Sequence, residues 1–163
     1  MPTFSIDLEY SKISSRKFVK CCFHVDNFTI GDFDQLMLLG SYELAMNDLI
    51  KRLENAPNYD FRDTSDIFSV FEVLSTAFRT GEFKLDESLQ QANFSAMNTD
   101  AFFALPLAIE AFDGEEAFIF MHNCNWVFVW KEWKNKVINH RKIDKNIYVE
   151  KLKLAMKNQS SSS

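Results

Sequence analysis

Residues 115–130 read EEAFIFMHNCNWVFVW, two apolar runs separated by a short polar segment. The first run is Glu115–Met121, and the polar segment His122–Asn125 is typical of a turn. The second run, Trp126–Trp130, places apolar side chains on both faces of an extended chain. A strand that is apolar on both faces usually lies between two packed layers. We therefore expect residues 126–130 to form a central strand covered by helices.

An earlier apolar run, Leu107–Phe112, precedes this stretch, and Asp113-Gly114 separates it from Glu115–Met121. Asp-Gly tolerates the positive φ angles of a type I′ turn better than most dipeptides. The pattern predicts a β-hairpin between residues 107–112 and 115–121, followed by the strand at 126–130.

Three further strands are predicted near the N-terminus. Phe4–Tyr10 alternates apolar and polar residues, and Lys17–Val25 follows a polar connection, so the two favour an antiparallel hairpin. Asp26-Asn27 supplies a turn before the short run Phe28–Ile30, which Gly31 interrupts.

Apolar stripes at helical spacing predict three helices. The first spans residues 41–54, with Ser41 as its N-cap. The second is capped by Thr64 or Ser65 and ends at Gly81, and the third is capped by Asp144. These elements predict an α+β fold in which an antiparallel sheet of about five or six strands packs against about three helices.

The chain is expected to be a single domain over residues 1–157, followed by a flexible polar tail at residues 158–163. The sequence pattern does not decide the structure of residues 82–106. A helical turn fits residues 86–91, and either a strand or a helix fits residues 100–105.

Acidic residues outnumber basic ones, which gives a formal net charge of −5. Residues 26–130 hold 18 acidic and 5 basic side chains, whereas residues 131–157 hold 3 acidic and 9 basic ones. A mostly acidic body does not suit nucleic-acid phosphates, so we expect no nucleic-acid partner and interpret the basic run 131–145 as a solvated connector. The acidic body favours a cationic protein partner, although acidic surfaces also simply keep proteins soluble.

The sequence has no apolar run of about 18 residues and no basic leader before an apolar core. We therefore expect a cytoplasmic protein with no membrane contact. The three cysteines, Cys21, Cys22 and Cys124, fit the reduced thiols of that compartment.

The most enzyme-like group is Cys124 with His122 beside it and Asp113 nearby in the sequence. A thiol-dependent hydrolase using Cys124 and His122 would have a depressed thiol pKa and rapid alkylation of that cysteine. No glycine-rich elbow follows Cys124 to supply an oxyanion site, so we favour a protein without catalytic residues. A structural or scaffold subunit, with exposed apolar surface and constitutive oligomers, is a further alternative.

Metal and cofactor motifs are not apparent. His24, His122, His140 and the cysteines show no paired spacing such as C-x-x-C or H-x-x-x-H, so no metal site is expected. The four glycines are scattered and do not build a phosphate-binding loop, so no cofactor is expected.

Two groups of acidic residues are candidates for binding a protein partner. The first group follows the N-terminal strands, and the second surrounds the Asp113-Gly114 turn. Fixed carboxylates of this kind steer a basic protein toward the surface and then pair with its lysines and arginines. The candidates are Asp26, Asp32, Asp34 and Glu43 in the first group, and Glu110, Asp113, Glu115 and Glu116 in the second.

Several of these features follow one another in a fixed order that covers nearly the whole chain. They are the strands at 17–30 leading to Ile30-Gly31-Asp32, the two helices, and Glu110–Gly114 before the aromatic run 126–133. In this order the chain resembles bacterial immunity proteins, especially those that accompany contact-dependent growth inhibition toxins and the group called immunity protein 42. The resemblance implies a small cytosolic monomer that binds the C-terminal domain of its cognate toxin one to one. Binding would neutralise the toxin by blocking its active site or substrate-binding surface.

With the acidic body, the resemblance predicts a basic toxin, expected to be a nuclease. The chain differs from a purely acidic binding protein in its basic segment after residue 130, so an acidic face need not be the whole interface.

Overall fold

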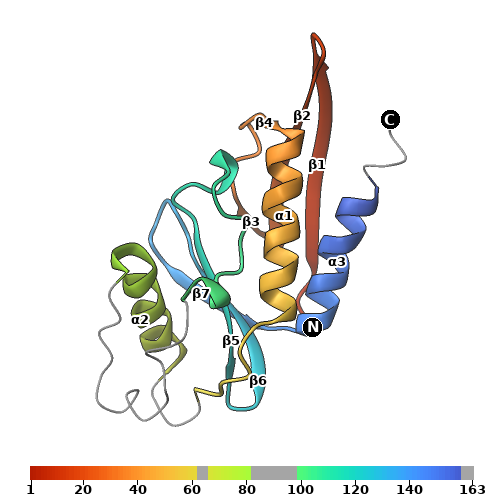
Figure 1. Ribbon diagram of the computed structural model, residues 1–163. Helices are drawn as coiled ribbons and strands as arrows, with labels where there is room; N and C mark the ends of the chain where they lie inside the picture. Colours follow the sequence, from red (N-terminus) through yellow and green to blue (C-terminus); the bar gives the residue numbers. More distant parts are fainter. Residues whose placement is uncertain (62–65, 82–98, 159–163) are drawn as a thin grey trace.

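The computed structural model of the chain describes residues 1–61, 66–81 and 99–158, which form two antiparallel sheets and three α-helices (Figure 1). This arrangement confirms the predicted α+β fold. The strands divide between two separately hydrogen-bonded sheets instead of lying in the one sheet expected, and both sheets bury aromatic side chains in one continuous core.

The first sheet contains β1 (Phe4–Ile13), β2 (Arg16–Val25), β3 (Phe28–Ile30) and β4 (Met37–Leu38). The predicted N-terminal hairpin is confirmed and is longer than expected, because only two residues separate β1 from β2 and Ser14 adopts a positive φ of 57° there. Both β3 and β4 pair with β2, at different parts of its length, which leaves β1 at the edge of the sheet.

The second sheet has the order β5 (Glu116–His122), β6 (Asn125–Lys131) and β7 (Ile138–Lys142). The central position of β6 is as predicted. Residues 127–130 are buried on both faces, whereas Trp126 is only half-buried at the strand's start.

Strand β7 corrects the interpretation of residues 131–145 as a solvated connector. It pairs with β6 from Val127 opposite Lys142 to Lys131 opposite Ile138. Its polar and basic side chains hide the strand signal, because an edge strand buries only part of its surface and its pairing is made by the backbone.

The predicted strand at residues 107–112 and its type I′ hairpin are wrong. Glu110–Phe112 form the 3₁₀ helix η3, and Asp113 has φ −61° and ψ 127°. Gly114 follows with φ 80°, and the closing hydrogen bond from the Glu115 N–H to the Phe112 carbonyl is 3.1 Å long. These angles define a type II turn, which also needs a positive φ at its second central residue, so Asp-Gly suits both turn types.

The type I′ geometry occurs instead at Asn123 and Cys124, with φ angles of 49° and 59°. These two residues connect β5 to β6, with His122 paired opposite Asn125. The turn predicted at residues 122–125 is therefore confirmed, and asparagine at its first central position tolerates the left-handed conformation.

The helices are α1 (Leu39–Glu54), α2 (Ile67–Thr80) and α3 (Lys145–Lys157). The expected Ser41 cap is wrong, because α1 begins at Leu39 and its N-cap Leu38 makes no side-chain hydrogen bond. None of the helices in the described ranges combines the length and the apolarity needed to cross a bilayer.

The ends of the other two helices follow the local signals more closely. Gly81 ends α2 with a left-handed φ of 68°, as predicted, while the N-cap is Asp66, whose carboxylate accepts from the Ser69 N–H at 2.9 Å. The candidate caps at 64 and 65 lie outside the described residues, as do the possible helical turn at 86–91 and most of the polar tail. Asp144 caps α3 as predicted and accepts from two backbone N–H groups of its first turn.

Aromatic contacts join these layers. Figure 1 shows α1 across the first sheet, α3 beside β1, and α2 near the second sheet. On α2, Phe71 meets Phe118 of β5 with ring centroids 5.5 Å apart. On α3, Tyr148 meets Phe4 of β1 at 4.4 Å and Phe128 of β6 at 5.5 Å, so one buried ring contacts both sheets.

An irregular buried segment lies between the helices and the second sheet. It follows the 3₁₀ helix η2 (Thr99–Phe102) and comprises residues 103–105, all buried. Arg52 of α1, whose side chain is only 12% exposed, donates to the carbonyls of Phe103 at 2.5 Å and Leu105 at 3.0 Å. The remaining carbonyl, of Ala104, accepts from the Tyr148 hydroxyl at 2.8 Å.

Replacing Arg52 with Met keeps an apolar stem and removes the guanidinium donors to the Phe103 and Leu105 carbonyls. We expect the free energy of unfolding to fall by about 1–3 kcal/mol for each buried carbonyl left unpaired, measured by urea denaturation followed by circular dichroism. The matched control is Lys51→Met, which changes an exposed neighbour in the same helix and should cost less than about 0.5 kcal/mol. Equal stability of Arg52→Met and the unaltered protein would contradict this role.

Candidate functional site

A groove of about 940 Å³ lies where the end of β3, the η3 turn and the β6–β7 connection meet. Its lining is strongly acidic, with five carboxylate residues and one lysine, Lys134. An exposed aromatic side chain, Trp133, lies among them. We call this surface the acidic groove, and its carboxylates are Asp32, Glu110, Asp113, Glu115 and Glu132.

Close backbone contact between β3 and η3 forms one wall. The Asp32 N–H donates to the Ala111 carbonyl at 2.7 Å, and the Gly31 N–H donates to Glu115 Oε1 at 3.3 Å. Gly31 has a φ of 97°, and a Cβ there would lie 2.9 Å from the Phe112 ring. A glycine is therefore required for the segment carrying Asp32 to lie this close to the segment carrying Glu115.

The opposite wall depends on a second glycine contact. A Cβ at Gly114 would lie 2.7 Å from Trp133 Cζ3, so the indole packs directly on the turn backbone. Lys136 Nζ lies 3.9 Å from the centroid of the same indole, a cation–π distance. Trp133 nevertheless stays 58% exposed. The indole is thus supported from two sides and accessible from the groove.

Glu132 is fixed by two amide donors, Asn135 Nδ2 at 2.6 Å and Asn139 Nδ2 at 2.7 Å. These contacts order the β6–β7 connection on which Trp133 lies. Sequence reasoning missed both Glu132 and Trp133 as site residues, because their basic surroundings suggested a solvated connector. The available signal was a tryptophan in an otherwise polar run.

The groove carboxylates differ in their surroundings. Burial raises the pKa of Glu115, and the Gly31 N–H and the Lys136 charge oppose that rise. Asp32 accepts from the Asp34 N–H at 2.9 Å and stays exposed, as do Glu110 and Asp113. Within the described ranges, those three exposed carboxylates form no ion pair, so their charge is not neutralised by the protein's own cations.

The structure separates the eight predicted partner-binding residues into those of the groove and those elsewhere. Asp32, Glu110, Asp113 and Glu115 come together although about 80 residues separate the two groups in the chain. Asp34 adjoins Asp32 through its backbone N–H. Partner binding by any of the eight stays a prediction.

The other three acids have different surroundings. Asp26 forms an ion pair with Arg141 of β7 at 2.7 Å, and the Arg141 hydrogen bond lowers the Asp26 pKa. Glu116, in β5, accepts from the Ser75 hydroxyl at 2.7 Å and lies 3.3 Å from Arg79 of α2. Glu43 lies on α1 in a separate shallow hollow. Asp26 and Glu116 therefore hold elements of the fold together.

The structure separates Asp113 from the other two residues of the candidate thiol site. Cys124 lies exposed in the type I′ turn, and its backbone N–H donates to Asp60 Oδ2 at 2.9 Å. His122 Nδ1 lies 3.3 Å from the Asn123 amide nitrogen. Asp113 lines the acidic groove, near the opposite end of β5 from His122 and Cys124.

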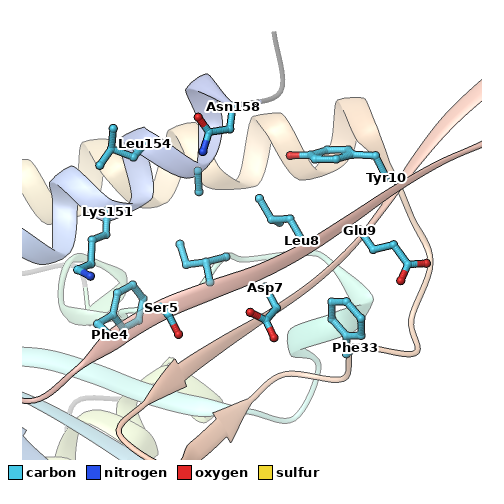
Figure 2. Close-up of a pocket in the computed structure, with 12 residues that line it drawn as sticks. Phe4, Ser5, Asp7, Leu8, Glu9, Tyr10, Phe33, Lys151, Leu154 and Asn158 are labelled. Carbon is cyan, nitrogen blue, oxygen red and sulfur yellow. The ribbon is translucent and has the colours of Figure 1, made fainter. Parts of the chain in front are cut away.

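A second hollow, of about 710 Å³, follows the edge strand β1 (Figure 2). Leu8 and Tyr10 lie on the side of β1 that faces α3, with Leu154 and Asn158 across from them. Asp7 projects to the other side of the strand, the side on which Phe33 also lies. The hollow mixes polar and apolar side chains and holds no concentration of one charge.

A protein-family model described as immunity protein 42 matches residues 2–156. The matched span includes both sheets, all three helices and every carboxylate of the acidic groove, so the similarity concerns the whole fold. No curated protein and no solved structure matches the chain significantly.

Gly114→Ala tests the support of Trp133. The φ of 80° strains alanine, and the added Cβ forces the indole away from the turn, so we expect destabilisation by more than about 1 kcal/mol and a red-shifted tryptophan fluorescence maximum. Gly40→Ala is the matched control, because a Cβ at Gly40 in α1 meets nothing within 4 Å. Gly40→Ala should stabilise by about 0.4–1 kcal/mol. Similar effects of the two substitutions would contradict the proposed contact.

Proposed function

Since the chain belongs to the immunity protein 42 family, we propose that it is the antitoxin of a basic toxin domain, which it binds one to one in the cytoplasm through the acidic groove. Family membership supports an antitoxin role with a toxin as protein partner, and this role requires binding and no catalysis. We further propose that the toxin is a nuclease and that the groove covers its active site or its substrate-binding surface.

One observation supports the groove most directly: it unites carboxylates from both groups of candidate acids. Asp32 comes from the end of β3, whereas Glu110 and Asp113 come from η3 and its turn. These exposed carboxylates are not neutralised by internal ion pairs within the described ranges, so their combined field is available to steer a cationic partner.

A nuclease fits this surface because it must itself present lysines and arginines to nucleic-acid phosphates. The groove carboxylates would pair with those cations and exclude the substrate. The partly buried Glu115, held by the Gly31 N–H, suits a toxin arginine that becomes desolvated in the complex. The exposed carboxylates act mainly at long range and raise the association rate.

Trp133 supplies the apolar part of the proposed interface. Exposed aromatic side chains held in one orientation are frequent hot spots, because they bury a large area with little loss of conformational freedom. The Gly114 backbone and Lys136 hold the indole in this way. The groove thus combines charge for encounter with an aromatic anchor for the bound state.

Co-expression with the toxin domain encoded beside this chain's gene tests the role itself. We expect restored growth and a stable one-to-one complex by size-exclusion chromatography with light scattering. Unchanged toxicity in the presence of the folded protein would refute the antitoxin proposal. Neutralisation of a toxin that is not a nuclease would support the antitoxin role and refute the proposal that the toxin is a nuclease.

The triple variant Asp32→Asn, Glu110→Gln, Asp113→Asn tests the groove. Removing three exposed negative charges should slow association with the toxin domain and flatten its dependence on ionic strength, measured by stopped-flow fluorescence. The matched control is Glu43→Gln, Glu72→Gln, Glu150→Gln, which makes the same change in net charge outside the groove. A control variant that slows association more than the groove variant would place the interface on the helices.

Trp133→Ala tests the anchor. We expect binding to weaken by about 2 kcal/mol or more, mainly through faster dissociation, measured by surface plasmon resonance. Phe68→Ala removes an aromatic side chain of similar exposure, 45%, from α2 and should leave the affinity nearly unchanged. Full affinity of Trp133→Ala would show that the indole lies outside the interface.

A further inference from the structure

The register of the first sheet brings three potential metal ligands together. Asp7 of β1 lies opposite Cys22 of β2, and His24 lies two residues along β2 on the same face. His24 Nε2 lies 2.9 Å from Asp7 Oδ2 and 3.5 Å from Cys22 Sγ. Among the described residues, this is the one group of three such side chains whose ligand atoms all lie within 4.8 Å of one another.

We propose that Asp7, Cys22 and His24 form a zinc-binding site, in which water completes a tetrahedral shell. Sulfur, imidazole nitrogen and carboxylate oxygen are the ligands that zinc accepts in proteins, whereas calcium and magnesium prefer oxygen alone. The zinc proposal does not rest on the proposed antitoxin role.

The distances fit this geometry. With a zinc–sulfur bond of about 2.3 Å and a zinc–nitrogen bond of about 2.0–2.1 Å, tetrahedral angles place the sulfur and nitrogen roughly 3.6 Å apart. The observed separation of Cys22 Sγ and His24 Nε2 is 3.5 Å. The 2.9 Å separation of the His24 nitrogen and the Asp7 oxygen is a hydrogen-bond distance. It opens slightly when both atoms bind an ion between them.

A second residue orients the imidazole. Thr29 of β3 pairs opposite His24 in the sheet, and its Oγ1 lies 3.1 Å from His24 Nδ1. With Nε2 bound to the ion, Nδ1 holds the ring hydrogen and donates it to Thr29 Oγ1. Histidine ligands usually have such an acceptor for their other nitrogen, and it fixes both the tautomer and the ring plane.

The burial pattern gives the site a closed and an open side. Cys22 is 2% exposed, whereas the Asp7 side chain is 62% exposed and faces the hollow lined by Phe33 (Figure 2). An ion therefore enters past Asp7, and the water ligand lies on that side. The nearby Glu9 lies 3.9 Å from Lys20 as its ion-pair partner, so it is not counted among the ligands.

Zinc binding must displace the proton of the Cys22 thiol. Burial, with a smaller effect of Asp7, raises the pKa of Cys22 to about 11, so the thiol holds its proton before the ion binds. Zinc replaces that proton, which passes to solvent. The cation also offsets the repulsion between the new thiolate and the Asp7 carboxylate, which is the smaller of the two effects that disfavour the thiolate in the protein alone.

The test uses the full chain, treated with a chelator and kept reduced. Titration calorimetry with zinc chloride should give one ion per chain, and cobalt should give a thiolate-to-metal charge-transfer band. Asp7→Asn and His24→Gln should each weaken zinc affinity at least tenfold. Thr29→Val keeps the side-chain shape and should weaken zinc affinity about 10–100-fold, because it removes the acceptor that orients the His24 ring.

The double variant Cys124→Ser, His122→Gln is the control. It removes a thiol and an imidazole that lie two residues apart in the exposed β5–β6 turn, outside the proposed zinc site. This variant should bind zinc with unchanged affinity and retain the cobalt band. Asp7→Asn alters an exposed side chain, and circular dichroism should show an unchanged fold. Less than one ion per chain, unchanged affinity in Asp7→Asn and His24→Gln, or loss of binding in the control would each overturn the proposal.

Discussion

The fold depends on how the polar groups of one irregular backbone segment find hydrogen-bond partners inside the core. Residues 103–105 are buried without belonging to a helix or to one of the two sheets' strands, so their polar groups need partners from elsewhere. Arg52 and Tyr148 supply the donors to their carbonyls, and the Ala104 N–H donates to the Ala117 carbonyl of β5 at 2.9 Å. Two helices and the second sheet are thereby fixed to the same short stretch. The chain then reaches η3, which forms part of the acidic groove.

Tyr148 shows why this arrangement is stable. Burial raises the pKa of its hydroxyl, which keeps the proton that Ala104 accepts. Its ring contacts Phe4 and Phe128, one from each sheet. Losing the hydroxyl leaves a buried carbonyl unpaired, and losing the ring leaves a cavity between the sheets. Two sheets without a shared edge are thus held together by side chains.

Local signals were sufficient for the N-terminal hairpin, the Gly81 and Asp144 helix ends and the central strand β6, because each depends on neighbouring residues. The Asp113-Gly114 turn was mistaken in type, since a positive φ at glycine serves both type I′ and type II turns. Strand β7 was missed because its side chains are polar and its pairing with β6 is made by the backbone. Trp133 was missed because its contact with the Gly114 turn joins residues far apart in the sequence. The Cys22-x-His24 pair fits a strand's period of two, but its third ligand, Asp7, becomes visible only through the strand register.

The short strand β3 links the two surfaces proposed to bind ligands. Thr29 in its centre orients His24 on one side, and Phe28 packs on Trp130 of the second sheet with ring centroids 5.3 Å apart. One residue beyond β3, Gly31 begins the backbone contact that forms the groove wall. A three-residue strand has few hydrogen bonds of its own, so its position is set largely by these side-chain contacts. An ion bound at the proposed zinc site would fix His24 and Thr29, and would thereby also restrict the backbone that positions Asp32 in the groove.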